Sequence, residues 1–348
     1  MLRLKPGFQV LASHAGFRAR GLTTVNASRS LRRAAAALLL GGTSTALAAY
    51  FLLPDISRGA PTCDNIPLSP SHFTPAKLVS STITSSGTKI LTLAIPPELL
   101  PEEGDLFAPI WSVFIKDDDI QVERPYTPLD GVDENGNMKF WIKRYQHGEV
   151  SRWLHSKQVG DTIEIRGPLK TWSWKDDAWD EIILISGGTG ITPFYQLLRT
   201  VSSGNSSFQG RITLLHSSKT LSELPPHDIL DPLLNFARHN PEKFRLKFFV
   251  DSFGETKGQS SMDLEVHKGS IGKESIRSAL HSVSWFPWWR GLFSQDSDVS
   301  DRKILFLVCG PEKMVEAIAG PYGRNYSQGP VGGVLQSLGY KSRQVWKL

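Results

Sequence analysis

The sequence predicts a two-domain α+β protein: an antiparallel β-barrel, then an α/β domain built on a parallel sheet, with a transmembrane helix ahead of both. Three observations predict this order. Basic and apolar residues are segregated at the N-terminus, short alternating strands follow from residue 72, and from residue 179 apolar strands alternate with helical segments. The 348 residues are enough for about two domains of ~100–200 residues each.

Residues 1–33 have the composition of a mitochondrial targeting leader. Seven of the 39 basic residues and none of the 34 acidic residues lie in residues 1–54, so the net charge of +5 arises there. A positive leader without acidic residues is typical of import into mitochondria. The remainder of the chain carries no basic stripe, which argues against a nucleic-acid partner.

A transmembrane helix is expected at residues 34–53, which contain no charged side chain. At 1.5 Å per residue, a run of about 20 residues spans a hydrocarbon core of ~30 Å. Arg32 and Arg33 precede this run, so the N-terminus is expected in the matrix and the rest of the chain in the intermembrane space. A secretory signal peptide is the alternative, although the apolar run is longer than is usual for one.

Residues 54–71 are rich in Pro and Ser and are expected to be a linker, and residues 72–178 are expected to form the barrel. Turn signals such as Ser86-Gly87 separate the barrel strands, which are expected at 76–83, 88–95, 110–116, 138–145 and 161–167. Residues 179–348 are expected to form the α/β domain. Its strands are expected at 181–186, 211–217, 244–250 and 303–310.

The sequence ILISGGTGITP runs from an apolar strand through Gly187, Gly188 and Gly190 into a helix. We expect Thr192 to cap this helix and Pro193 to occupy its first position. Free backbone N–H groups at a helix N-terminus favour a phosphate. Pro193 stands where the dinucleotide-binding fingerprint requires a third glycine, so this loop alone does not establish a nucleotide site.

Two further motifs carry side chains suited to a flat, phosphorylated cofactor. ERPYTPL at 123–129 places Arg124, Tyr126 and Thr127 on one extended strand, and we expect strand alternation to separate Tyr126 from the other two. The guanidinium can bind a diphosphate, and the ring can pack on a conjugated system. CGPEKM at 309–314 ends a predicted parallel strand, at the sheet edge where open α/β folds bind ligands.

In the chain the three motifs follow one another as ERPYTPL, ILISGGTGITP and CGPEKM. This set, over residues 72–348, resembles the ferredoxin–NADP reductase superfamily and most closely its NADH–cytochrome b5 reductase branch. The resemblance implies an FAD-binding barrel followed by an NAD(P)-binding α/β domain. It implies an enzyme that takes two electrons from a reduced nicotinamide into FAD and passes them singly to a haem or cytochrome acceptor. No metal site is expected, since Cys63 and Cys309 are the only cysteines and form no ligand cluster.

The resemblance assigns a first group of residues to FAD. Arg124 would bind the pyrophosphate, Tyr126 would pack on the isoalloxazine, and Thr127 would donate toward the flavin nitrogen that accepts hydride. The other implied FAD-binding residues are Pro125, Lys143, Tyr145, Gly148, Glu149, Val150 and Ser151. His147 and Glu149 depart from the family pattern, and because a carboxylate repels a diphosphate we expect Glu149 to point outward.

The resemblance assigns a second group to the nicotinamide nucleotide. This group comprises Gly187, Gly188, Gly190, Thr192, Cys309, Gly310 and Pro311. Gly167-Pro168 resembles the family's turn beneath the flavin, where the chain begins to leave the barrel. Thr127, Thr192 and Cys309 are the candidate catalytic residues nearest the hydride transfer. Cys309 is expected to form the pocket wall and not to act as a nucleophile, since no base adjoins it in the sequence.

The sequence leaves the choice between NADH and NADPH open. Ser217, Ser218 and Lys219 could bind a 2′-phosphate, whereas Glu223 could bond a free ribose hydroxyl. Likeness to the family favours NADH.

Two Trp-rich segments lie outside the reductase pattern, one at 170–179 and one in an insertion at 282–301. Each is either a satellite hydrophobic cluster or a surface for a partner or membrane. The leader, the apolar run and the insertion resemble fungal flavoproteins described as cytochrome c mitochondrial import factors, which implies a role in cytochrome c haem attachment. A b5-type reductase on the outer mitochondrial membrane and an FAD-containing assembly protein with little turnover are the alternatives.

Overall fold

The computed structural model describes residues 60–85, 87–101, 109–173, 179–202, 208–253, 264–281, 302–324 and 327–348. The predicted leader, the apolar run at 34–53 and the Trp-rich insertion at 282–301 lie outside these ranges. Within them, no helix is both long and apolar enough to cross a membrane. The chain from residue 59 onward forms one compact unit.

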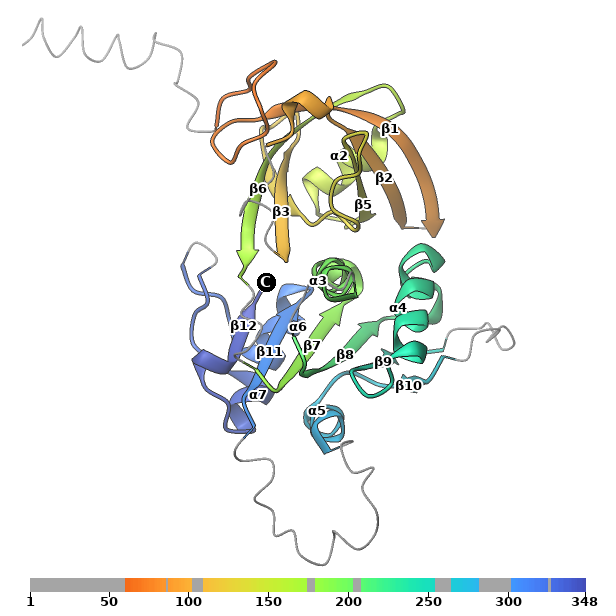
Figure 1. Ribbon diagram of the computed structural model, residues 1–348, viewed down its shortest axis with the longest axis vertical. Helices are drawn as coiled ribbons and strands as arrows, with labels where there is room; N and C mark the ends of the chain where they lie inside the picture. Colours follow the sequence, from red (N-terminus) through yellow and green to blue (C-terminus); the bar gives the residue numbers. More distant parts are fainter. Residues whose placement is uncertain are drawn as a thin grey trace, which may run out of the picture. The chain divides into compact units, whose positions relative to one another are not determined.

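The first half of this unit is a six-stranded antiparallel sheet (Figure 1). Its strands are β1 (Thr74–Ser85), β2 (Thr88–Ala94), β3 (Ile110–Lys116), β4 (Glu123–Tyr126), β5 (Asn137–Lys143) and β6 (Thr162–Trp172). A short 3₁₀ turn, η1 (Pro97–Leu99), follows β2, and α2 (Glu149–Ser156) follows β5. The strand order is β4-β3-β6-β1-β2-β5, so in the described residues the expected barrel is a sheet with β4 and β5 at its edges.

Period-two alternation explains why these segments form strands around one core. In β2, Leu91 and Leu93 are buried while Thr92 between them is only partly covered. One apolar cluster joins side chains of β1, β2, β3, β5, β6 and α2. All five strands expected in this half are confirmed, and the extended strand expected at the ERPY segment is β4.

Two further expectations, about residues 60–71 and Gly167-Pro168, are wrong. Residues 60–71 were expected to belong to a linker, yet Leu68 is buried and its N–H donates to the carbonyl of Leu99 at 2.7 Å. This short Pro-rich stretch packs because its apolar side chain and backbone groups find partners on the sheet. Gly167-Pro168 lies inside β6 and not in a turn, because the β6 pairing with β3 continues past it to Trp172.

The second half is a six-stranded parallel sheet with strand order β10-β9-β8-β7-β11-β12. Its strands are β7 (Glu181–Gly187), β8 (Arg211–Ser218), β9 (Phe244–Val250), β10 (Val266–Lys268), β11 (Ile304–Cys309) and β12 (Val345–Lys347). The helices are α3 (Thr192–Ser202), α4 (His227–His239), α5 (Lys273–His281), α6 (Glu312–Ala319) and α7 (Gly333–Ser337). The 3₁₀ turns η2 (Gly188–Ile191), η3 (Leu221–Glu223) and η7 (Ser342–Gln344) connect these elements.

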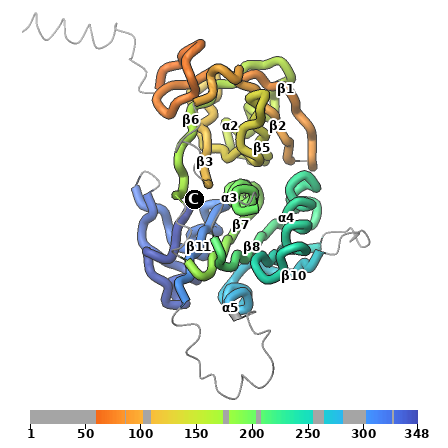
Figure 2. The backbone as a smooth tube through the Cα atoms, in the orientation of Figure 1, coloured from red at the N-terminus to blue at the C-terminus, as the bar shows by residue number. Residues whose placement is uncertain are grey.

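Helices cover both faces of the parallel sheet. Figures 1 and 2 show α3 and α4 on one side and α5 on the other. Every residue of β7 is buried, as expected for a central strand covered on both faces. Ile182 and Leu184 pack with α3 and α4, whereas Ile183 and Ile185 pack with α5, α6 and α7. The four strands expected here are confirmed; β10 and β12, with three residues each, were too short for a periodic signal.

Helix α3 also packs against the antiparallel sheet. The core that contains Phe194 and Leu197 of α3 includes Ile110, Leu129 and Trp141 from the first half of the unit. The segment between β7 and α3, where the sequence predicts a phosphate loop, is thus fixed against both halves.

Candidate active site

A cavity of about 720 Å³ is lined by residues of both halves. Its walls are the edge strands β4 and β5, the N-terminus of α2, the loop between β7 and α3, and the residues that follow β11. Cavities of ~300–1,000 Å³ are typical of small-molecule and cofactor sites. The two edges of the antiparallel sheet therefore both contribute to one site.

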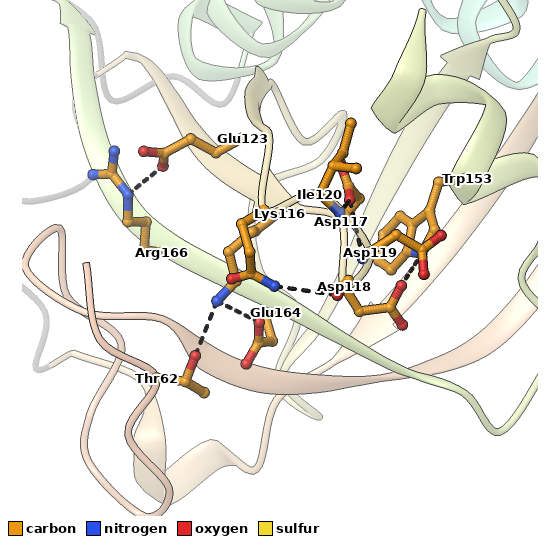
Figure 3. Close-up of polar contacts among 11 residues, drawn as sticks. Thr62, Lys116, Asp117, Asp118, Asp119, Ile120, Glu123, Trp153, Glu164 and Arg166 are labelled. Atoms are coloured by element: carbon orange, nitrogen blue, oxygen red, sulfur yellow. Dashed lines mark hydrogen bonds and ion pairs between the residues drawn. The ribbon is translucent and has the colours of Figure 1, made fainter. Parts of the chain in front are cut away.

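One ion pair ties β4 to β6, and a second ties β3 to β6 (Figure 3). Arg166 of β6 pairs with Glu123 of β4 at 2.7 Å and donates to the carbonyl of Pro70 at 3.0 Å. Lys116 of β3 pairs with Glu164 of β6 at 2.6 Å. The Arg166–Glu123 pair thus fixes the residue before Arg124 to β6.

Arg124 places a positive charge at the wall of the cavity. Its guanidinium is exposed and donates to the backbone carbonyl of Glu123 at 2.9 Å. Among the described residues it has no carboxylate partner. A guanidinium without an acidic partner, at the wall of a cavity, is suited to bind a diphosphate with two parallel hydrogen bonds.

Tyr126 and Thr127 line the same cavity as Arg124. In the register of β3 and β4, Arg124 lies opposite Ile115 and Tyr126 opposite Val113. The expectation that alternation separates Tyr126 from Arg124 is wrong, because residues two apart on a strand share a face. Burial raises the pKa of the Tyr126 phenol, so this ring is a neutral wall for a flat ligand.

The N-terminus of α2 forms a second wall. Gly148 is its N-cap residue, and the Ser151 hydroxyl accepts from the N–H of Tyr145 at 3.2 Å and donates to the carbonyl of Gly148 at 3.0 Å. Glu149 is exposed in the first turn, where a carboxylate stabilises a helix N-terminus. The same N–H groups and dipole favour a phosphate.

The loop between β7 and α3 forms the third wall. Gly188 has a φ of +53°, which a side chain would strain. A Cβ on Gly190 would lie 2.5 Å from the carbonyl oxygen of Cys309, so only glycine allows these two backbones to meet. Thr192 is the first residue of α3 and not its cap: it has helical φ and ψ, and its hydroxyl donates to the carbonyl of Thr189 at 3.1 Å. Thr192 does not cap the helix because the 3₁₀ turn η2 leads directly into α3.

Cys309 and the two residues after it close the cavity beside this loop. Burial raises the pKa of the Cys309 thiol to about 12, so the sulfur stays protonated and uncharged at neutral pH. Across the cavity, the Tyr145 hydroxyl lies 3.5 Å from that of Thr189. The site thus combines an anion-binding end, formed by Arg124 and α2, with a neutral end suited to flat rings. These residues fit FAD with a nicotinamide beside it.

Comparison with known proteins agrees with this reading. Residues 75–174 match the family model described as oxidoreductase FAD-binding domain, and residues 184–320 match the one described as oxidoreductase NAD-binding domain. NADH-cytochrome b5 reductase 2 of Lodderomyces elongisporus is 34% identical over 228 residues, which cover 65% of this chain and 67% of that protein. NADH-cytochrome b5 reductase 2-A of Vanderwaltozyma polyspora is 31% identical over 264 residues, covering 76% and 79%.

The chain belongs to the NADH–cytochrome b5 reductase family. It is an FAD- and NADH-dependent oxidoreductase of that type. The cytochrome b5 reductase domain of Ulva prolifera nitrate reductase has the same fold, with a TM-score of 0.58 at 20% identity, over 81% of this chain and 100% of that one.

Most of the residues predicted from the reductase motifs lie together. Those that line the cavity are Arg124, Pro125, Tyr126, Thr127, Tyr145, Gly148, Glu149, Val150, Ser151, Gly190, Thr192, Cys309, Gly310 and Pro311. Those that do not line it are Lys143, Gly187, Gly188, Ser218 and Lys219. Lys143 pairs with Glu223 at 2.6 Å, and the buried Ser218 hydroxyl donates to the carbonyl of Glu223 at 3.2 Å.

Sequence reasoning missed several cavity residues. Ser112 and Thr171 come from paired strands β3 and β6, and their hydroxyls lie 3.2 Å apart. Only the strand pairing brings them together, so no local pattern could have found them. The others are Phe140, Trp141, Ile142, Gln146, Thr189, Pro193 and Leu348, together with His147, which was noted only as a departure from the family.

Proposed function

We propose that the chain passes electrons from NADH through FAD to a haem-protein acceptor, and that the cavity residues named above hold both cofactors. One observation carries this proposal: a single cavity joins the Arg124–Thr127 motif, the α2 N-terminus, the glycine loop and the Cys309 segment. When bound, FAD accepts a hydride from NADH and releases electrons one at a time.

The protein's part in this reaction is binding, orientation and exclusion of water. Arg124 and the N–H groups of Gly148–Ser151 bind the pyrophosphate of FAD, and the ring of Tyr126 supports the isoalloxazine. The Thr127 hydroxyl donates toward the hydride-accepting nitrogen. Gly190 and Thr192 hold the nicotinamide nucleotide, while the protonated Cys309 and Pro311 keep that end of the cavity apolar.

Selection of NADH over NADPH is assigned to Glu223, just beyond β8. An acidic residue in this position bonds a free ribose hydroxyl and repels a 2′-phosphate. Lys143 pairs with this carboxylate at 2.6 Å, and the Ser218 hydroxyl is turned into the protein, where it donates to the carbonyl of Glu223 and not toward a phosphate.

The acceptor and the location are further parts of the proposal. The relatives are named for cytochrome b5, which supports a cytochrome acceptor. The basic leader and the apolar run at 34–53 support an anchor in the inner mitochondrial membrane with the reductase in the intermembrane space. That place would suit a role in cytochrome c haem attachment, and an outer-membrane b5 reductase is the second candidate.

An anaerobic titration of the purified protein tests the proposed reductase. The flavin absorbance is expected to bleach with one equivalent of NADH and far more slowly with NADPH. Reoxidation by ferricyanide, cytochrome b5 and cytochrome c is then compared. A protein that binds FAD but is not reduced by NADH would support the assembly-protein alternative instead.

A further inference from the structure

The buried side chain of Gln196 makes an unusual contact between the two halves. Gln196 lies in α3, one turn after Thr192, and is 4% exposed. Its Oε1 accepts from the backbone N–H of Trp111 in β3 at 2.8 Å, and its Nε2 donates to the carbonyl of Pro128 at 3.1 Å. One amide group therefore binds two backbone groups of the first half, one in β3 and one two residues beyond the end of β4.

The register of β3 and β4 shows that the N–H of Trp111 and the carbonyl of Pro128 would face each other if the strand pairing continued. Val113 lies opposite Tyr126, and this antiparallel register, continued by two residues, would place Trp111 opposite Pro128. The paired segment stops at Tyr126. The Gln196 side-chain amide instead lies between the N–H of Trp111 and the carbonyl of Pro128. It bonds both groups, as a backbone peptide group of an intervening strand would. The strands separate at the point where the Arg124–Thr127 motif ends.

The position of Gln196 along α3 links it to the loop between β7 and α3. Thr192 and Gln196 are four residues apart, so they share a face of the helix and are about 6 Å apart along its axis. Thr192 lines the cavity, as do Gly190 and Pro193 beside it. Pro128 directly follows Thr127, which lines the same cavity.

We propose that Gln196 is a positioning residue, which sets the approach of the nicotinamide loop to the flavin motif. This inference depends on the proposed function, since it concerns the geometry of hydride transfer. Reacting atoms must come within about 3–3.5 Å, and a misplacement of about 1 Å can cost on the order of 10²-fold in rate. Gln196 touches neither reacting group. It fixes the separation between Thr127 and Thr192 through the backbone on one side and the helix on the other.

The test compares Gln196→Met with wild type in the full-length protein. Methionine has a similar length but can form neither hydrogen bond. FAD is expected to stay bound, because Arg124 and α2 are untouched, and the dissociation constant for NADH should change by less than about threefold. The rate of flavin reduction at saturating NADH should fall by about 10–100-fold. The rate of flavin reoxidation by ferricyanide should be unchanged. This result would distinguish a misplaced nicotinamide loop from a general disruption of the fold.

Arg199→Gln is the matched control. Arg199 lies on the same helix and forms an exposed contact with Asp130 of the first half at 3.6 Å. Losing an exposed pair costs little, so flavin reduction should stay within about twofold of wild type. A Gln196→Met protein that binds FAD and is reduced at the wild-type rate would overturn the inference.

Gln196→Glu provides a second variant should Gln196→Met not fold. A protonated glutamic acid can accept from Trp111 and donate to Pro128 as glutamine does, whereas a carboxylate faces the Pro128 carbonyl without a proton. Burial raises the pKa of a carboxyl group. The reduction rate of this variant should therefore rise toward the wild-type rate as the pH is lowered, and a ratio to wild type that does not change with pH would contradict the inference. If wild type itself is not reduced by NADH, the proposed function fails and the inference fails with it, whereas a wild type that is reduced, with a Gln196→Met protein reduced equally fast, overturns the inference alone.

Discussion

Arg124 is the residue on which we expect FAD binding to depend most. We expect Arg124→Ala to weaken FAD binding by about 10–100-fold, since it removes the charge-assisted hydrogen bonds to the pyrophosphate, worth about 1.5–3 kcal/mol. The measurement is the FAD dissociation constant from flavin fluorescence. Arg238→Ala, an exposed arginine of α4 away from the cavity, is the control. Equal FAD affinity in Arg124→Ala and wild type would place the pyrophosphate elsewhere.

His216 is a buried residue that makes stability depend on pH. It is fully buried, with Nδ1 2.8 Å from the Ser186 hydroxyl and Nε2 3.1 Å from that of Ser218. Burial, with the nearby charge of Lys143, lowers its pKa to about 3. The unfolded chain, with a histidine pKa of about 6.5, therefore binds the extra proton between about pH 3 and 6.5, so the stability of the folded state falls as the pH falls through that range.

The variant His216→Gln tests this linkage. One proton contributes about 1.4 kcal/mol per pH unit to the free energy of unfolding, and the variant should lose that part of the slope between pH 6 and 4. Urea denaturation at several pH values measures it. His239→Gln, which changes an exposed histidine at the end of α4, should keep the wild-type slope. If both variants have the same slope, His216 does not remain neutral in the fold.

The loop between β7 and α3 is held closely against the end of β11. In Gly190→Ala the new methyl group would meet the Cys309 carbonyl at 2.5 Å, so one backbone must move away from the other. We expect FAD to remain bound and NADH-driven flavin reduction to fall by about 10²-fold or more. Stopped-flow absorbance measures this rate. Gly272→Ala, where a Cβ meets no atom within 4 Å, should behave as wild type, and normal reduction in Gly190→Ala would show that the loop tolerates the shift.

The elements also show what a sequence can and cannot predict. Strands such as β2 and β7 carry their own signal, because alternation or a continuous apolar run is a local property. The sequence could not show that Thr192 is the first residue of α3 and not its cap, since the preceding 3₁₀ turn η2 continues into the helix and satisfies the groups that a cap would serve. The pairing of Ser112 with Thr171, and the contacts of Gln196, depend on strand register and on packing between halves, which no single segment contains.

At the scale of the whole molecule, the proposed location follows from charge asymmetry. The basic leader should direct import, and the apolar run should anchor the protein with its N-terminus in the matrix. The protein is then expected to resist carbonate extraction, and protease should digest the reductase only after the outer membrane is ruptured. Digestion in intact mitochondria would favour the outer-membrane reductase, and protection after rupture would place the protein in the matrix.

The central claim is that one cavity brings NADH and FAD together. Anaerobic addition of NADH to the purified, FAD-loaded protein tests this claim most directly. The account predicts that one equivalent of NADH bleaches the flavin absorbance, and that Gly190→Ala with the same FAD content does so about 10²-fold more slowly. A wild-type protein that holds FAD yet keeps its oxidised spectrum in excess NADH would contradict the account.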